Sequence, residues 1–83
     1  MDNIIVLGIS VSHRNDVSAQ IQDILTNNGC KIHARLGLPL QDFNTCSDMG
    51  LIIIQLICTK EEALKVKTEI NLLPDVKADL MVL

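Results

Sequence analysis

Two stretches of this 83-residue chain are apolar at almost every position, and they constrain its fold more than any other feature. Residues 3–10 read NIIVLGIS and residues 49–58 read MGLIIIQLIC. A strand that is apolar on both faces belongs in the middle of a sheet, because both faces must then be shielded from water. The sequence therefore predicts a sheet built around two central strands.

Apolar residues at helical spacing occur between these two strands and again after the second of them. From about Arg14 the apolar residues recur at intervals of three and four, and Asn27-Asn28-Gly29 predicts the end of that helix. Thr59-Lys60-Glu61-Glu62 is a capping box, in which the side chains of Thr59 and Glu62 each accept the other's backbone N–H. A second helix therefore begins there, and Pro74 predicts its end.

Two further segments, residues 30–38 and 76–82, alternate apolar with polar side chains, as half-exposed strands do. Over residues 1–83, a single domain, the predicted order is strand, helix, strand, strand, helix, strand. This is the βαββαβ order of the ferredoxin-like α+β sandwich, a four-stranded antiparallel sheet with two helices on one face. Its first and third strands lie centrally, where we place the two apolar ones.

One face of such a sheet has no helical cover, and that face is normally wet. Here it is apolar: if Ile5, Leu7 and Ile9 face the helices, the uncovered side carries Ile4, Val6, Leu51, Ile53 and Ile57. Turning the first strand over exposes a similar set. A contiguous apolar patch usually marks an interface, so we predict a homo-oligomer, most simply a two-fold dimer, with these five residues in its interface.

Alternation within residues 30–38 also predicts which side chains face away from the helices. The apolar set begins with Cys30 and Ile32 and is expected to face the helices. His33 and Arg35 then share the opposite face. There they either border the interface or form a polar row that faces water.

Composition excludes several other classes of protein. With a net charge of −3 and 1% aromatic residues, the chain lacks the clustered Lys, Arg and stacking rings of a nucleic-acid surface, so no direct nucleic-acid binding is expected. The apolar stretch 51–58 is far shorter than the ~20 residues of a membrane-spanning helix, so no membrane partner is expected. A start without a secretory pattern and three cysteines without CxxC spacing favour a cytoplasmic protein with reduced thiols.

Few residues are candidates for chemistry. Cys30 and His33 are three apart in a predicted strand, so their side chains point to opposite faces and cannot share a metal ion. His13, Cys46 and Cys58 could form a metal site only by meeting between subunits or in a fold other than the one predicted, and a surface histidine with packing cysteines is the favoured interpretation. There is no glycine-rich phosphate loop, nucleophile elbow or carboxylate pair. We therefore expect no enzyme activity and no cofactor.

The best candidate for a small-ligand site precedes the first helix. Ser12, His13, Arg14 and Asn15 gather at a helix N-terminus, where free backbone N–H groups and the helix dipole favour an anion or a carboxylate. Helix capping within a solvated loop accounts for the same residues and is the simpler alternative.

The residues at the end of the second predicted strand are similar to those of a known protein family. Ala34-Arg35-Leu36-Gly37-Leu38-Pro39 is followed by a polar loop and by Met49-Gly50-Leu51-Ile52-Ile53-Ile54. With this element and the predicted layout, the chain resembles, over nearly its full length, the iron-only hydrogenase system regulator family. The fold of that family is similar to ACT domains and to the C-terminal domain of nickel-responsive regulators.

The resemblance implies a cytoplasmic, oligomeric regulatory domain with an ACT-like fold. ACT domains commonly bind amino acids at subunit interfaces near the loop after the first strand, which implicates His13, Arg14 and Asn15. The nickel site of the nickel-responsive relatives is not implied. Arg35-Leu36-Gly37 and Met49 stand where those relatives have a His-x-His pair and a cysteine.

Three hypotheses for the function follow. The first is a non-catalytic regulatory homo-oligomer that senses a small ligand, or engages a protein partner, in the hydrogenase system. The second is a metal-binding sensor or carrier that uses His13 with cysteines. The third is an assembly adaptor that binds no ligand.

Overall fold

The computed structural model describes residues 3–12, 14–39 and 50–83, and it describes side chains there except those of residues 14–18, 38 and 39. The elements are β1 (Asn3–Val11), α1 (Arg14–Asn27), β2 (Ile32–Pro39), β3 (Gly50–Cys58), α2 (Lys60–Asn71) and β4 (Val76–Val82), with the 3-10 turn η1 (Gly29–Lys31) before β2. The predicted order is confirmed. The polar loop predicted over residues 41–48 lies outside the described residues.

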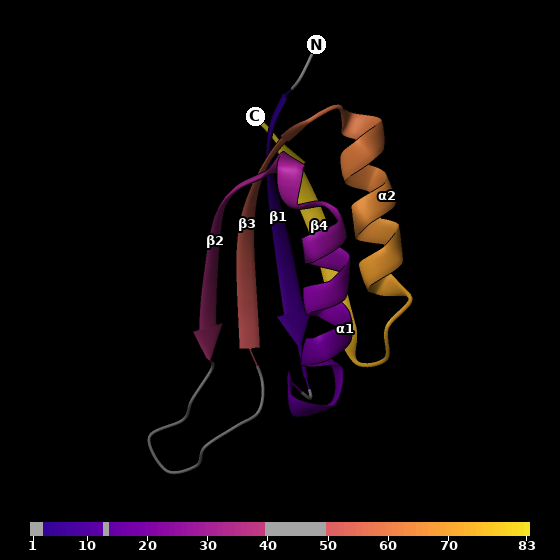
Figure 1. Ribbon diagram of the computed structural model, residues 1–83. Coiled ribbons are helices and arrows are strands. Elements are labelled where there is room, and N and C mark those ends of the chain that lie inside the picture. The colour runs from indigo at the N-terminus through magenta and orange to yellow at the C-terminus, as the bar shows by residue number, and fades with distance from the viewer. Residues whose placement is uncertain (1–2, 13, 40–49) are drawn as a thin grey trace.

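The four strands form one antiparallel sheet in the order β2-β3-β1-β4. The two strands that are apolar throughout are central, as predicted, and the ferredoxin-like α+β fold is confirmed. In Figure 1 both helices lie on one face of the sheet, toward β1 and β4, while β2 lies at the opposite edge. Within the described part of the chain, no helix is long and apolar enough to cross a membrane.

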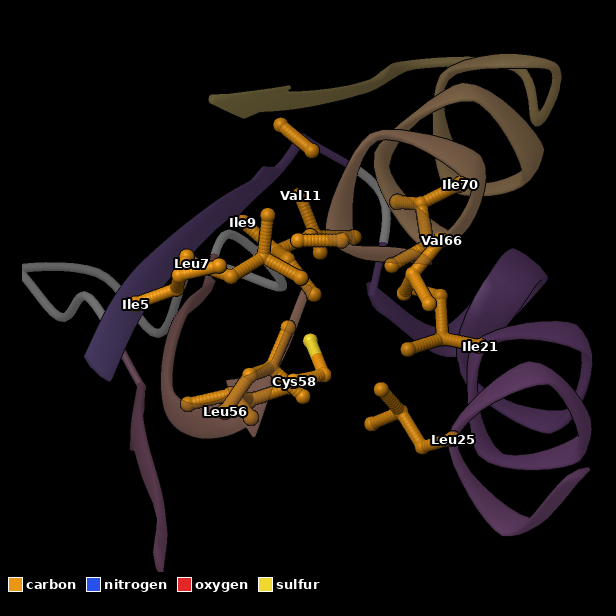
Figure 2. Packing of buried hydrophobic residues seen from close by; sticks show 13 residues of the cluster. Ile5, Leu7, Ile9, Val11, Ile21, Leu25, Leu56, Cys58, Val66 and Ile70 are labelled. Carbon is orange, nitrogen blue, oxygen red and sulfur yellow. The ribbon is translucent and has the colours of Figure 1, made fainter. Parts of the chain in front are cut away.

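The core lies between the sheet and the helices. Ile5, Leu7 and Ile9 of β1 are each 0% exposed, so every second residue of the strand is buried. Figure 2 shows these side chains converging with those of the flanking elements, and the buried cluster also contains Val11, Ile21, Leu25, Ile54, Leu56, Cys58, Ala63, Val66, Ile70 and Ala78. Of the two orientations that the sequence left open for this strand, the structure has the one in which Ile5, Leu7 and Ile9 face the helices.

The capping box at the start of α2 is present with both of its bonds. The Thr59 hydroxyl accepts from the backbone N–H of Glu62 at 3.2 Å, and the Glu62 carboxylate accepts from the backbone N–H of Thr59 at 3.3 Å. The same hydroxyl donates to Glu62 Oε1 at 2.9 Å. These bonds from Thr59, assisted by Lys31, lower the pKa of the Glu62 carboxyl.

We expect Thr59→Ala to lower the free energy of unfolding by about 1 kcal/mol near neutral pH, because α2 loses its N-cap. Since the pKa of Glu62 is lowered in the folded state, its contribution is present above the ordinary pKa of a glutamate and is lost as the pH falls through the folded value. The difference between wild type and variant should therefore shrink in acid. Urea denaturation at a series of pH values measures it, and an equal difference at every pH would contradict this account.

The second strand departs from its predicted register. Ile32 pairs with Leu56 of β3, but Ala34 pairs with Gln55, so a β-bulge at His33 shifts the alternation by one residue. Arg35 therefore pairs with Ile54, on the helix side of the sheet, and Leu36 lies on the helix-free face. The prediction that Arg35 faces away from the helices was wrong. Cys30 is also not in the strand but in the turn η1.

Candidate functional site

The residues predicted to bind a small ligand lie where β1 passes into α1. Ser12 is exposed, and its backbone N–H donates to the carbonyl of Asp75 at 2.9 Å, which ties the end of β1 to the turn before β4. Asp75 has a φ of 58°, a left-handed conformation that aspartate tolerates better than most residues. Arg14 opens α1, whereas His13 and the side chains of Arg14 and Asn15 lie outside the described residues.

The three residues considered for a metal do not come together among the described residues. Cys58 ends β3 and is 2% exposed, within the core between the sheet and the helices. His13 and Cys46 lie outside the described residues. Within residues 3–12, 14–39 and 50–83, no three His, Cys, Asp or Glu side chains are placed to hold a metal ion.

A depression of about 360 Å³ lies on the outer side of α2, lined by Leu64, Lys65, Thr68 and Glu69. The Thr68 hydroxyl donates to the Leu64 carbonyl at 2.8 Å within the helix. Ligand sites usually enclose most of their ligand. A depression lined by one exposed helix flank does not, and we assign it no role.

The helix-free face of the sheet is the largest candidate surface. Paired residues of an antiparallel sheet share a face, so the register places there eight large apolar residues whose side chains the structure describes. They are Ile4, Val6, Leu36, Leu51, Ile53, Ile57, Met81 and Leu83. Ile4 is 48% exposed, Leu36 53% and Met81 54%, and the others are half-buried by their neighbours or exposed.

The five residues predicted for the interface all lie on this helix-free face. Leu36 was missed because the β-bulge, which has no signal in the alternation, turns it over. Met81 and Leu83 could have been found, since Met81 pairs with Val6 in the order of strands predicted from the sequence. Four strands with seven or more residues each give the face a flat area of about 450 Å².

Glycine marks the centre of this face. Gly8 pairs with Ile53 on one side and with Asp79 on the other, and a Cβ built on it would meet no atom within 4 Å. Its backbone therefore lies open to the outside between taller neighbours. Another molecule can approach the middle of the sheet more closely there than elsewhere.

Charge is confined to the β4 side of the face. Lys77 pairs with Ser10 and Asp79 with Gly8. The Asp79 carboxylate lies 3.2 Å from the ammonium of Lys67 in α2, so it reaches around the edge of the sheet toward the helix layer. The hydrogen bond from the Leu80 backbone N–H, followed by Lys67, lowers the pKa of Asp79. Both interactions draw this carboxylate away from the apolar rows.

Comparison with known proteins found similarity among solved structures. No protein-family model matches the chain. No curated protein matches it. Among solved structures, the chain is similar to uncharacterized protein TM1266 from Thermotoga maritima, with a TM-score of 0.88, 19% identity, and coverage of 100% of this chain and 99% of that chain. At this identity the likeness shows the fold alone.

Proposed function

We propose that the protein is a non-catalytic regulatory domain that works as a homo-oligomer, with two copies joined through the helix-free face of the sheet. The observation that carries the proposal is the set of apolar side chains that extends across all four strands of that face, with Gln55 as the polar residue among them on β3. Isolated exposed apolar residues are ordinary on protein surfaces, whereas a contiguous patch of several hundred Å² usually marks a contact.

A second copy of this chain fits the face in size. A standard interface buries about 800 Å² on each partner, and crystal contacts mostly bury less than about 400 Å² on each. The flat area of about 450 Å² is a lower bound, because pleats and side chains enlarge the accessible surface. Contact over the whole face would therefore exceed the area of most crystal contacts.

Shape and charge also favour a second copy. An isologous contact requires a surface that complements itself. The face has both protruding side chains, Ile4 and Met81, and a low centre at Gly8. Its charges are one lysine and one aspartate, Lys77 and Asp79, so two copies of the face need not repel each other although each chain carries −3.

The resemblance to iron-only hydrogenase system regulators extends the proposal to a role in that system, with a small ligand bound near Ser12, His13, Arg14 and Asn15. It is supported by the βαββαβ layout and by the residues 34–39 that end β2. The metal-carrier alternative uses His13, Cys46 and Cys58. Of these, Cys58 lies within the described residues, and its place in the core favours a packing role. The regulatory oligomer is therefore the better supported function.

Sedimentation velocity tests the face contact. We expect the wild type to be a dimer or larger at micromolar concentration, and the double variant Ile4→Lys, Met81→Lys to associate at least about 100-fold more weakly, because two charges on each copy would be buried without partners. Adding amino acids or nucleotides to the same measurement tests ligand sensing, since a ligand at a subunit boundary shifts the association constant.

The matched control places the same two charges outside the face. Leu64 and Leu72 of the α2 region are 39% and 80% exposed, and the double variant Leu64→Lys, Leu72→Lys should associate like the wild type. Circular dichroism checks that both variants fold. A monomeric wild type, or equal association of the two variants, would overturn the proposal.

A further inference from the structure

A glutamine lies within the apolar surface of the helix-free face. Gln55 pairs with Val6 of β1 and with Ala34 of β2, so these three residues share that face. Along β3, the next residues on the same face are Ile53 and Ile57. The side chain of Gln55 therefore has apolar neighbours on both adjacent strands and in both directions along its own strand.

The amide of Gln55 has no hydrogen-bond partner within residues 3–12, 14–39 and 50–83. The residue is half-buried, and water still reaches its amide in the single chain. A contact through the helix-free face would remove that water. Because a buried amide without a partner is costly, the second copy has to offer Gln55 a polar group.

The other polar residues that the register places on this face lie away from Gln55. Lys77 pairs with Ser10, four residues along β1 from the partner of Gln55. The carboxylate of Asp79 is held at 3.2 Å by Lys67 of the helix layer. Gln55 itself lies on a central strand near the middle of the face, which is where a two-fold contact of largest overlap has its axis.

We propose that Gln55 lies on the two-fold axis of the face contact and pairs with the partner's Gln55. The proposal rests on the face contact of the proposed function. A primary amide carries one acceptor oxygen and two N–H donors, so two facing amides can exchange two N–H···O bonds. Such a pair complements itself, whereas Lys77 or Asp79 facing its own copy would repel it.

The length of a glutamine fits the spacing of stacked sheets, which lie about 10 Å apart. The amide carbon of an extended glutamine is about 4 Å from its Cα, and hydrogen bonding sets two facing amide carbons about 4 Å apart. A modest tilt of the two side chains therefore spans the gap. The side chains across from Gln55, Val6 and Ala34, are shorter and leave the amide accessible to a partner.

The amide pair acts on the register of the contact more than on its strength. The two bonds replace bonds to water, so their net contribution is modest, but a shifted arrangement would bury both amides against apolar side chains. A single buried asparagine fixes the register of coiled coils in the same way. Gln55 thus selects one overlap of the two apolar faces over the others.

Opposite charges at position 55 test whether this residue faces its own copy. In sedimentation velocity we expect Gln55→Glu and Gln55→Lys each to associate at least about 100-fold more weakly than the wild type, because like charges would be buried opposite each other. An equimolar mixture of the two variants should regain most of the association, since a carboxylate then faces an ammonium. Native mass spectrometry should show one copy of each variant in the dimer.

The matched controls make the same changes on an exposed part of α1. Gln22→Glu and Gln22→Lys should associate like the wild type, both alone and mixed. Hydrogen exchange gives a second measurement that needs no variant and does not depend on how the variants fold. The side-chain N–H groups of Gln55 should exchange slowly in the assembled wild type and rapidly after dilution to the monomer.

Failure of the amide pair is distinguishable from failure of the face contact. A mixture that stays as weak as its two components, single variants that associate like the wild type, or rapid exchange of the Gln55 amide in the assembly would each overturn the pair. The face contact is judged separately by Ile4→Lys, Met81→Lys. If that variant dissociates while the Gln55 mixture does not recover, the face is the interface and its axis lies elsewhere.

Discussion

Leu7→Ala is expected to lower the free energy of unfolding by about 2–5 kcal/mol, the usual range for a leucine removed from a packed core. Leu7 is 0% exposed at the middle of β1, and it pairs with Ile54 on one side and Leu80 on the other. A cavity there touches both neighbouring strands and lies against the helix layer. Because small domains are stable by only about 5–15 kcal/mol, the variant should be close to unfolding at 37 °C.

Val6→Ala is the matched control, one residue away on the opposite face of the same strand. Val6 is half-buried in the single chain, so the loss should be smaller. Urea denaturation at several protein concentrations separates the two effects, since binding of a partner to the folded state makes stability depend on concentration. The loss at Leu7 should not vary with concentration, whereas the loss at Val6 should. Equal losses at both positions would contradict the assignment of faces.

Asn71→Ala is expected to open the β4 edge of the sheet, where the side-chain amide of Asn71 donates to the Ala78 carbonyl at 3.0 Å and accepts from the Ala78 backbone N–H at 2.8 Å. The variant leaves the backbone N–H and carbonyl of Ala78 unpaired at the β4 edge, with a loss of about 1–3 kcal/mol in stability. The larger effect is on association. With both edges available, β2 of one copy can pair with β4 of the next, and such head-to-tail contacts do not close. Sedimentation should show species that grow with protein concentration.

Two further variants make this expectation specific. Asn28→Ala also removes an asparagine near the end of a helix, one that donates to the Ile24 carbonyl at 2.8 Å, but it touches no sheet edge and should not cause growth. Adding Gly37→Pro, which removes a backbone N–H from the edge strand β2, to Asn71→Ala should stop the growth by blocking the other edge. Growth that persists in the double variant would show that the β2 edge is not involved.

Most of the fold was predictable because its signals are local. The apolar runs of β1 and β3, the alternation of β4 and the capping box at Thr59 each lie within ten residues of sequence, and the structure confirms all of them. The order of elements then leaves few ways to arrange four strands and two helices. The apolar helix-free face follows directly from that arrangement.

The missed features depend on single residues or on contacts distant in sequence. A bulge adds one residue without changing composition, so nothing in residues 30–38 showed that Leu36 and Arg35 exchange faces. The cap on β4 joins Asn71 to Ala78, whereas an asparagine near the end of a helix commonly bonds only nearby residues, as Asn28 does with Ile24 and Lys31. These features decide which edge is open, and they therefore required the structure.

The strand order also has a consequence for how the chain folds during synthesis. Ile9 of β1 pairs with Ile52 of β3 and with Ala78 of β4. Because both partners are distant in sequence, neither pairing of β1 can form until most of the chain has been synthesised. Closing such long loops slows folding, and an unpaired apolar strand is prone to aggregate in the meantime. During synthesis, the apolar β1 therefore stays without its two neighbouring strands until β3 and β4 have been made.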